Sequence, residues 1–342
     1  MVFIRVNNID IICIFIKMFI HGSNSGCKIC FYNMNHIGDI YFSSLFINLI
    51  CKMNNDITFY YYSIIGDYFF EKIQNIERIN KIENNYSNTL MNGNPPEELL
   101  DNSILKILLS NRMEREGAKY IQINSEKILF VNTWCKSCFL NHEDFDINSA
   151  IFSYINLIKI LNSNFNLTLS FKINKPNDLI KYMDNYHLDN GNIDIDGSSI
   201  FIFNYCPRSV NFNMYEYNKF ILNLSKTNKI ILSCYSNVFQ DNVNIKFIDK
   251  DYNINFLPNC KNLIQLWEIA IKCNKIIIIE SGSSWTFLHK INEIKPNQIF
   301  MYNNNNNYCQ RLNETINVLF NPLIHQTPIL SVSSSKELKN YL

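Results

Sequence analysis

The sequence predicts an α/β protein made of two doubly wound domains that face each other across a cleft. Strand and helix patterns alternate along the chain, and the alternation begins again after a turn-rich stretch near residue 190. A length of 342 residues also fits two domains better than one. Because ligands of parallel α/β sheets bind beyond the carboxyl ends of the strands, we expect the functional residues in the loops that follow strands.

Three segments of the first half carry the clearest patterns. Residues 28–33 form a short apolar run that predicts a strand, and residues 40–53 are apolar over a length that suits a buried helix. Aromatic and branched residues at 56–63 are typical of a strand. Residues 64–120 are mixed. The elements expected after them are a strand at 127–134 and helices at 146–161 and 176–186.

The second half begins after the turn-rich sequence that runs from Asn190 to Ser198. Leu263, Leu266, Trp267 and Ala270 share one face of a predicted helix. The four isoleucines at 276–279 are typical of a central parallel strand that is covered on both faces. The other expected elements are strands at 200–204, 229–233, 244–248 and 298–302 and helices at 214–225 and 336–342.

Composition and charge exclude two classes of protein. Apolar residues make up 47% of the chain, and 31 basic against 30 acidic residues leave a net charge of +1. A disordered chain needs lower hydrophobicity and a higher net charge. A nucleic-acid-binding surface needs clustered lysines and arginines, so we expect no nucleic acid among the partners.

The eleven cysteines predict free thiols and a cytoplasmic location. Disulfide frameworks belong to short secreted chains, whereas Cys13, Cys30, Cys51 and Cys273 lie in apolar runs, where a thiol behaves as a small hydrophobic side chain. The apolar run at 9–20 is too short to span a bilayer, so we expect no transmembrane segment. A signal peptide or anchor is less favoured than a dispensable extension or an added edge strand.

The first candidate motif, His36-Ile37-Gly38-Asp39, directly follows the strand predicted at 28–33. Gly38 allows a tight turn, and Asp39 falls at the start of the next helix. A carboxylate there would accept a proton from an acceptor hydroxyl at the edge of the cleft. The simpler interpretation is that Asp39 only caps the helix. Asp67 follows a predicted strand in a similar sequence and is interpreted as a turn residue.

The second candidate motif, Glu280-Ser281-Gly282-Ser283-Ser284, follows the four isoleucines. A strand, a loop of small residues and the start of a helix form an anion site, because free amides and the helix dipole point at the loop. Gly282 would let a diphosphate approach the backbone, and Glu280 would accept hydrogen bonds from ribose or sugar hydroxyls. The alternative is an ordinary turn between a strand and a helix.

In the order and spacing of these motifs and elements, residues 28–302 resemble the heptosyltransferase-type glycosyltransferases (family 9, GT-B fold). The resemblance implies a Rossmann-like acceptor-binding domain at 27–190 and a Rossmann-like nucleotide-sugar-binding domain at 191–342, after an N-terminal extension at 1–26. It implies inverting transfer of a hexosyl or heptosyl group from a nucleotide sugar, with neither metal nor cofactor. Asp39 matches the proposed catalytic base, with His36 as second candidate. Glu280, Ser281 and Gly282 match the donor-binding loop.

The chain departs from that family at two places. The family often has a histidine shortly after the glycine of the donor loop, where this chain has Trp285. After the first strand of its second domain the family usually has a lysine that contacts donor phosphate, and residues 205–213 contain none. A guanidinium binds phosphate oxygens in a bidentate manner. We therefore expect Arg208, assisted by Ser209, to hold the diphosphate together with the amides of Ser281 to Ser284.

The expected partners are thus a nucleotide-sugar donor and a hydroxyl acceptor on a glycan, a lipid-linked molecule or a protein, in glycan biosynthesis. The missing lysine and Trp285 leave a second hypothesis open, a non-catalytic protein of the same fold that binds a nucleotide or a protein partner. A third is a nucleotide-sugar epimerase of the same architecture, which would need further acid and base residues in the cleft.

A structural metal site is the main competing interpretation of the cysteines. Cys27 and Cys30 have the spacing of zinc ligands, as do Cys135 and Cys138, with His142 four residues further on. Cys30 belongs to the first predicted strand and should point into the sheet, which disfavours the first pair. The second group follows a strand and could come together, but eleven cysteines make such spacings unsurprising, so we expect no metal.

Overall fold

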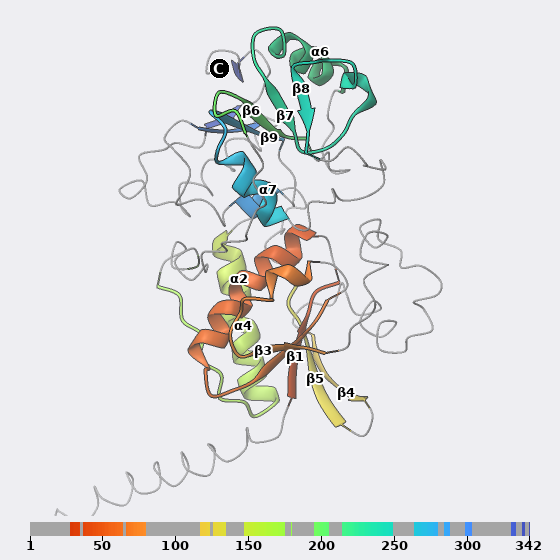
Figure 1. Ribbon diagram of the computed structural model, residues 1–342. Helices are drawn as coiled ribbons and strands as arrows, with labels where there is room; N and C mark the ends of the chain where they lie inside the picture. The colour runs from red at the N-terminus through yellow and green to blue at the C-terminus, as the bar shows by residue number, and fades with distance from the viewer. Residues whose placement is uncertain are drawn as a thin grey trace, which may run out of the picture.

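Two β-sheets, each accompanied by helices, make up the architecture, and both are dominated by parallel strands (Figure 1). The fold is therefore mixed α/β in both halves, as the sequence predicts. The N-terminal extension and the expected domain boundary at residue 190 lie outside the described residues. The computed structural model describes residues 28–34, 37–63, 66–79, 117–123, 126–134, 147–174, 179, 195–204, 214–248, 263–279, 284–287, 298–302, 330–332, 337–338 and 342.

In the described part of the first half, five strands form a sheet in the order β3-β2-β1-β5-β4. Neighbouring strands are parallel except for β4 and β5. The central strand is buried from Ile29 to Tyr32, so both of its faces are covered. The strands are β1 (Lys28–Tyr32), β2 (Phe59–Tyr62), β3 (Ile76–Arg78), β4 (Ala118–Ile123) and β5 (Glu126–Asn132).

The described strands of the second half form a sheet in the order β11-β10-β9-β6-β7-β8, and each neighbouring pair is parallel. The four isoleucines at 276–279 lie in its interior and are at most 2% exposed, which confirms the prediction made from their pattern. The strands are β6 (Ile200–Phe203), β7 (Ile230–Leu232), β8 (Ile245–Phe247), β9 (Lys275–Ile279), β10 (Ile299–Tyr302) and β11 (Leu330–Val332).

Both sheets are doubly wound. In the first, the chain moves outward from β1 through β2 to β3 and then places β5 on the other side of β1. In the second, it moves outward from β6 through β7 to β8 and then places β9 on the other side of β6. Each sheet therefore has one point at which the winding direction reverses, and ligands of such folds bind at the strand ends there.

Helices connect the parallel strands, as a parallel sheet requires. The helices α2 and α4 pack beside each other (Figure 1). The rings of Phe46 on α2 and Tyr154 on α4 stack nearly parallel, with centroids 3.9 Å apart. No helix in the described ranges is long and apolar enough to cross a membrane. The helices are α2 (Ile37–Met53), α4 (Ile147–Asn164), α6 (Met214–Leu224) and α7 (Leu263–Ala270), with 3₁₀ turns η1 (Asp67–Phe69) and η6 (Asn237–Phe239).

The described segments confirm most of the predicted elements, but the sequence does not predict β3, β4 or β11. β3 and β11 have three residues each, which is too short for a periodic pattern. β4 is an edge strand whose Tyr120 is 39% exposed, so it lacks the continuous apolar pattern of the central strands. The helix expected at 176–186 lies outside the described residues except for Leu179, and of the closing helix only 337–338 and 342 are described.

Candidate functional site

The first motif lies where β1 ends and α2 begins, at the reversal point of the first sheet. Gly38 is buried in the first turn of α2, and Asp39 beside it is half-buried. A carboxylate in this turn lies at the positive end of the helix dipole. His36, the second candidate base, lies outside the described residues.

A buried polar network fixes this first turn of α2 to the ends of two strands. The Asn33 side-chain amide donates to Ser43 Oγ at 2.7 Å and to the Asp39 carbonyl at 3.3 Å. Ser43 Oγ lies 2.9 Å from that carbonyl and 3.2 Å from the carbonyl of Thr133. The Tyr154 hydroxyl donates to the same Thr133 carbonyl at 2.8 Å. β1, α2, β5 and α4 are thus joined beneath Asp39.

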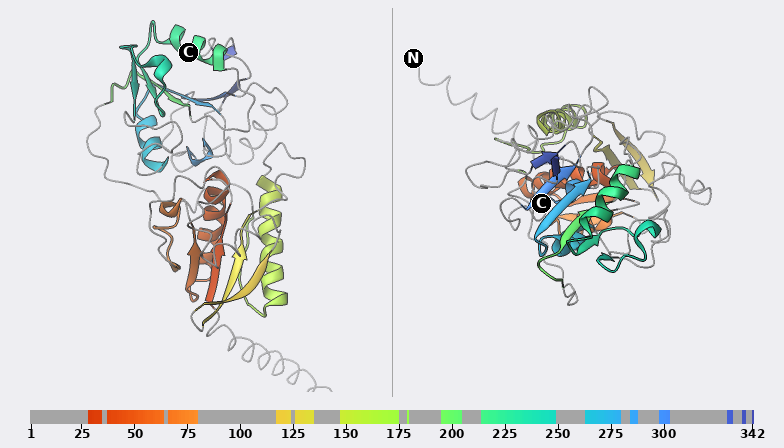
Figure 2. Two further views of the ribbon diagram at one scale, coloured as in Figure 1. Left: turned by 90° about the vertical axis from the view of Figure 1, so that its right-hand side faces the viewer. Right: turned by 90° about the horizontal axis from the view of Figure 1, so that it is seen from above.

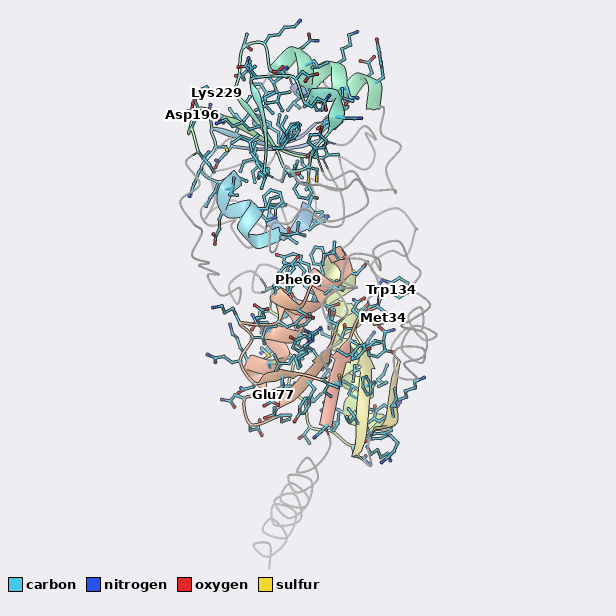
Figure 3. The ribbon with its side chains drawn as sticks, turned by 45° about the vertical axis from the view of Figure 1, so that its right-hand side comes forward. Met34, Phe69, Glu77, Trp134, Asp196 and Lys229 are labelled. Carbon is cyan, nitrogen blue, oxygen red and sulfur yellow. The ribbon has the colours of Figure 1, made fainter. Side chains whose placement is uncertain are left out.

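The strands of the first sheet run towards the second half of the molecule, so the edge formed by their carboxyl ends faces that half (Figure 2). Met34, which follows β1, and Trp134, which follows β5, both lie at the level where the two halves approach each other, as does Phe69 of η1 (Figure 3). The exposed ion pair of Asp196 and Lys229 precedes β6 and β7, so it lies at the amino-terminal edge of the second sheet and away from the candidate site (Figure 3).

Asp67 is more than the turn residue that the sequence indicates. Gly66 adopts a left-handed conformation with φ of 71°, as a turn requires, and a Cβ there would lie 2.9 Å from Ile37 Cδ1 at the start of α2. Asp67 Oδ2 then forms an ion pair with Arg78 Nη1 at 2.5 Å, at the carboxyl ends of β2 and β3. The pair ties this loop to β3 while the loop packs on the helix that carries Asp39.

Burial raises the pKa of Asp67 from 3.8 to about 6, with Arg78 opposing the shift and Glu71 adding to it. The side chain is 21% exposed. Its Oδ1 is buried and has no hydrogen-bond partner within the part of the chain that the structure describes. This half of the carboxylate therefore gains nothing from ionisation to offset the lost hydration, which is why the ion pair does not restore an ordinary pKa.

The second half places Asn204 at the end of β6, where it ties β6 to β7. Its side-chain oxygen accepts from the Cys234 amide at 2.8 Å, and its amide nitrogen donates to the Cys234 carbonyl at 3.1 Å. The segment expected to hold donor phosphate comes directly after this anchor. Arg208 and Ser209 belong to that segment and lie outside the described residues.

The second motif follows β9 in the sequence, and β9 pairs with β6 at the reversal point of the second sheet. Glu280, Ser281, Gly282 and Ser283 lie outside the described residues. Ser284 is fully buried, and the described residues 284–287 have a 3₁₀ conformation. The next residue, Trp285, is 3% exposed, and its ring contacts that of Phe42 on α2, with centroids 5.9 Å apart.

The cysteines that the structure describes are free and buried: Cys30, Cys51, Cys234 and Cys273. Cys30 points into the sheet as predicted, and burial raises its pKa well above the ordinary value. A buried neutral thiol is a poor metal ligand, since the thiolate is the binding form. The other candidate metal ligands, Cys27, Cys135, Cys138 and His142, lie outside the described residues. The described residues contain no cluster of metal ligands.

The fold defines a class, a doubly wound α/β protein with two sheets, each of which has one reversal point. No protein-family model and no curated protein matches the chain.

Solved structures similar to this chain include two of E. coli heptosyltransferase WaaC, one with ADP-2-deoxy-2-fluoro heptose (TM-score 0.39) and one with ADP (TM-score 0.40). Each match covers 80% of this chain at 8% identity, with 88% and 86% of the WaaC chain covered. An identity of 8% says nothing about individual residues, so a function for this chain depends on its own side chains.

Replacing Ser43 by alanine is expected to lower the free energy of unfolding by about 1–3 kcal/mol, because the buried Asn33 amide loses its 2.7 Å acceptor. Ser44→Ala is the matched control. Ser44 is also buried in α2, but its hydroxyl donates to the Tyr41 carbonyl one turn earlier, within the helix itself. Urea unfolding measures both variants, and equal losses would contradict the role given to the network.

Asp67 predicts a pH dependence of stability. Because its pKa is raised in the folded state, the folded protein keeps a proton that the unfolded chain loses between about pH 4 and about pH 6. The free energy of unfolding should therefore fall as the pH rises through this interval. Asp67→Asn should lack this component of the fall, whereas Asp241→Asn at an exposed position should keep it. Parallel pH profiles for the wild type and Asp67→Asn would refute the assignment.

Proposed function

We propose that the chain is an inverting glycosyltransferase that moves a sugar from a nucleotide-sugar donor to a hydroxyl acceptor, without metal or cofactor. The acceptor belongs to a glycan, a lipid-linked molecule or a protein, and the reaction takes place in the cytoplasm as a step of glycan biosynthesis. The first half binds the acceptor and the second half binds the donor.

One observation supports the proposal: the first motif lies at the reversal point of the first sheet, and β9, the strand that precedes the second motif in the sequence, pairs with β6 at the reversal point of the second sheet. The first follows β1 beside β5, and the second follows β9 beside β6. These are the places at which doubly wound sheets bind ligands. Trp285, directly after the second motif, touches the helix that begins with the first motif. A donor held by one loop and an acceptor held at the other would therefore be close together.

Asp39 is the proposed base. It lies half-exposed on a first helical turn that Asn33 and Ser43 hold from below, so its carboxylate is presented from a fixed backbone. In the reaction it removes the proton of the acceptor hydroxyl while the oxygen attacks the anomeric carbon from the face opposite the diphosphate. Inversion follows from this single displacement. His36 is the second candidate for this role or lines the acceptor pocket.

The leaving diphosphate needs preorganised positive charge or amide dipoles where its negative charge develops. The amides of the loop from Ser281 to Ser284, with Arg208 and Ser209, supply them in this proposal. Glu280 accepts hydrogen bonds from ribose or sugar hydroxyls. The support is the small-residue sequence of the loop, its place after a central strand and the burial of Ser284.

Asp39→Asn is expected to lower the rate of sugar transfer at least about a hundredfold, the lower range for loss of a positioned base, and to leave donor binding nearly unchanged. Asp56→Asn is the matched control, since Asp56 is exposed just before β2, at the opposite edge of the same sheet. A transfer assay and donor titration of both variants provide the test. Equal turnover of Asp39→Asn and the wild type would remove Asp39 from this role.

A thermal-shift series with UDP, GDP, ADP and CMP, and with their common sugars, tests the donor site. A ligand at about a hundred times its dissociation constant adds roughly 2.7 kcal/mol to the native state. We expect one nucleotide to stabilise the protein selectively, by at least about one to two degrees. Selective stabilisation without release of nucleoside diphosphate from any donor would favour the non-catalytic alternative instead. No response from any nucleotide would contradict the donor site.

A further inference from the structure

The contact between Phe42 and Trp285 joins the two candidate motifs. Phe42 lies three residues after Asp39 on α2, and Trp285 directly follows Ser284. Their rings are inclined by 56° with centroids 5.9 Å apart, a geometry typical of attractive aromatic pairs. Trp285 is 3% exposed at this contact with the other half.

Each ring of the pair also contacts other aromatic rings within its own half. On the first side, Phe42 packs on Tyr41, whose ring contacts Phe69 of η1. On the second side, Trp285 stacks on Phe287, which contacts Trp267 of α7. A chain of rings thus runs from the loop after β2 to the core of the second half.

Two more observations make this chain rigid at the second motif. Trp267 donates its indole N–H to Thr286 Oγ1 at 2.6 Å, which fixes the 3₁₀ turn that carries Trp285. Trp267 also stacks on Phe203 of β6 with centroids 5.0 Å apart. A single cluster of buried apolar side chains includes α2 as well as α7, β6 and β9, so apolar packing is continuous between the halves.

We propose that Trp285 is a positioning residue whose packing on Phe42 fixes residues 284–287, which directly follow the second motif, relative to Asp39. The coupling between the halves follows from the ring contacts. Its consequence for turnover rests on the proposed function. Because the indole is an uncharged, buried side chain, it orders the two loops without adding charge to the leaving group. Loss of this contact displaces donor and base relative to each other, and a displacement of about 1 Å costs about a hundredfold in rate.

A double-mutant cycle with Phe42→Leu and Trp285→Leu tests the coupling without any substrate. Leucine keeps both sites apolar, so these variants are chosen to fold. We expect the two single losses of unfolding free energy, measured by urea unfolding, to sum to clearly more than the loss of the double variant, as for side chains in direct contact. The control cycle pairs Phe42→Leu with Ile202→Val, in a core cluster that contains only second-half residues, and should be additive. Additive losses in the first cycle would overturn the coupling.

Steady-state kinetics then test the positioning role. Trp285→Leu should lower kcat about tenfold or more with little change in the KM for the donor, and Trp285→Phe should restore most of kcat, because it keeps a ring against Phe42. Tyr215→Ala, at an aromatic side chain that is 71% exposed on α6, is the control and should match the wild type.

These results separate the inference from the proposed function. If the wild type transfers sugar and the kcat of Trp285→Leu equals that of the wild type, the positioning role is overturned and the proposed function is not. If the wild type transfers no sugar, the proposed function fails, while the unfolding cycle still decides whether the two halves are coupled.

Discussion

The pairing of β1 with β5 and of β6 with β9 is the constraint on which the rest of the structure depends. Each pair brings together strands whose chain connections leave the sheet in opposite directions, so the carboxyl ends between them are not covered by a crossover. The paired strands are buried, and their backbone groups must bond to each other because water does not reach them. The two candidate motifs owe their positions to these pairs.

The central elements could be predicted because their burial shows in a short stretch of sequence. Ile276 to Ile279 is apolar at consecutive positions, which only a strand covered on both faces requires, and Leu263 to Ala270 repeats at helical spacing. The edge elements carry no such signal. Tyr120 of β4 faces solvent, and β3 is a three-residue strand, so neither is forced by hydrophobic pattern. The sequence therefore predicts the buried central elements better than the elements at the edges of the sheets.

Within the described part of the candidate site, the place of Gly38-Asp39 after a strand could be predicted from the sequence, but the contacts that support it could not. Gly38-Asp39 follows a strand visibly in the sequence, but nothing there indicates that Asn33 bonds to Ser43 or that Asp67 pairs with Arg78. Such contacts form between residues that are separate in sequence and meet only through the sheet order. Gly66 was the available signal for Asp67, since a left-handed glycine packed on Ile37 places the following carboxylate beside the sheet edge.

Trp285 bears on how the proposed donor site would stabilise negative charge. An indole offers one N–H donor and no charge, so a tryptophan in place of a histidine cannot neutralise a developing diphosphate. If the chain transfers sugar, that charge must be met by loop amides and Arg208, which makes the geometry of the loop more demanding. A large ring fixed by Phe42 and Phe287 suits that demand, because amide dipoles stabilise charge only when they are held in the right orientation. The tryptophan that brings no charge to this region thus also connects residues 284–287 to the helix of Asp39.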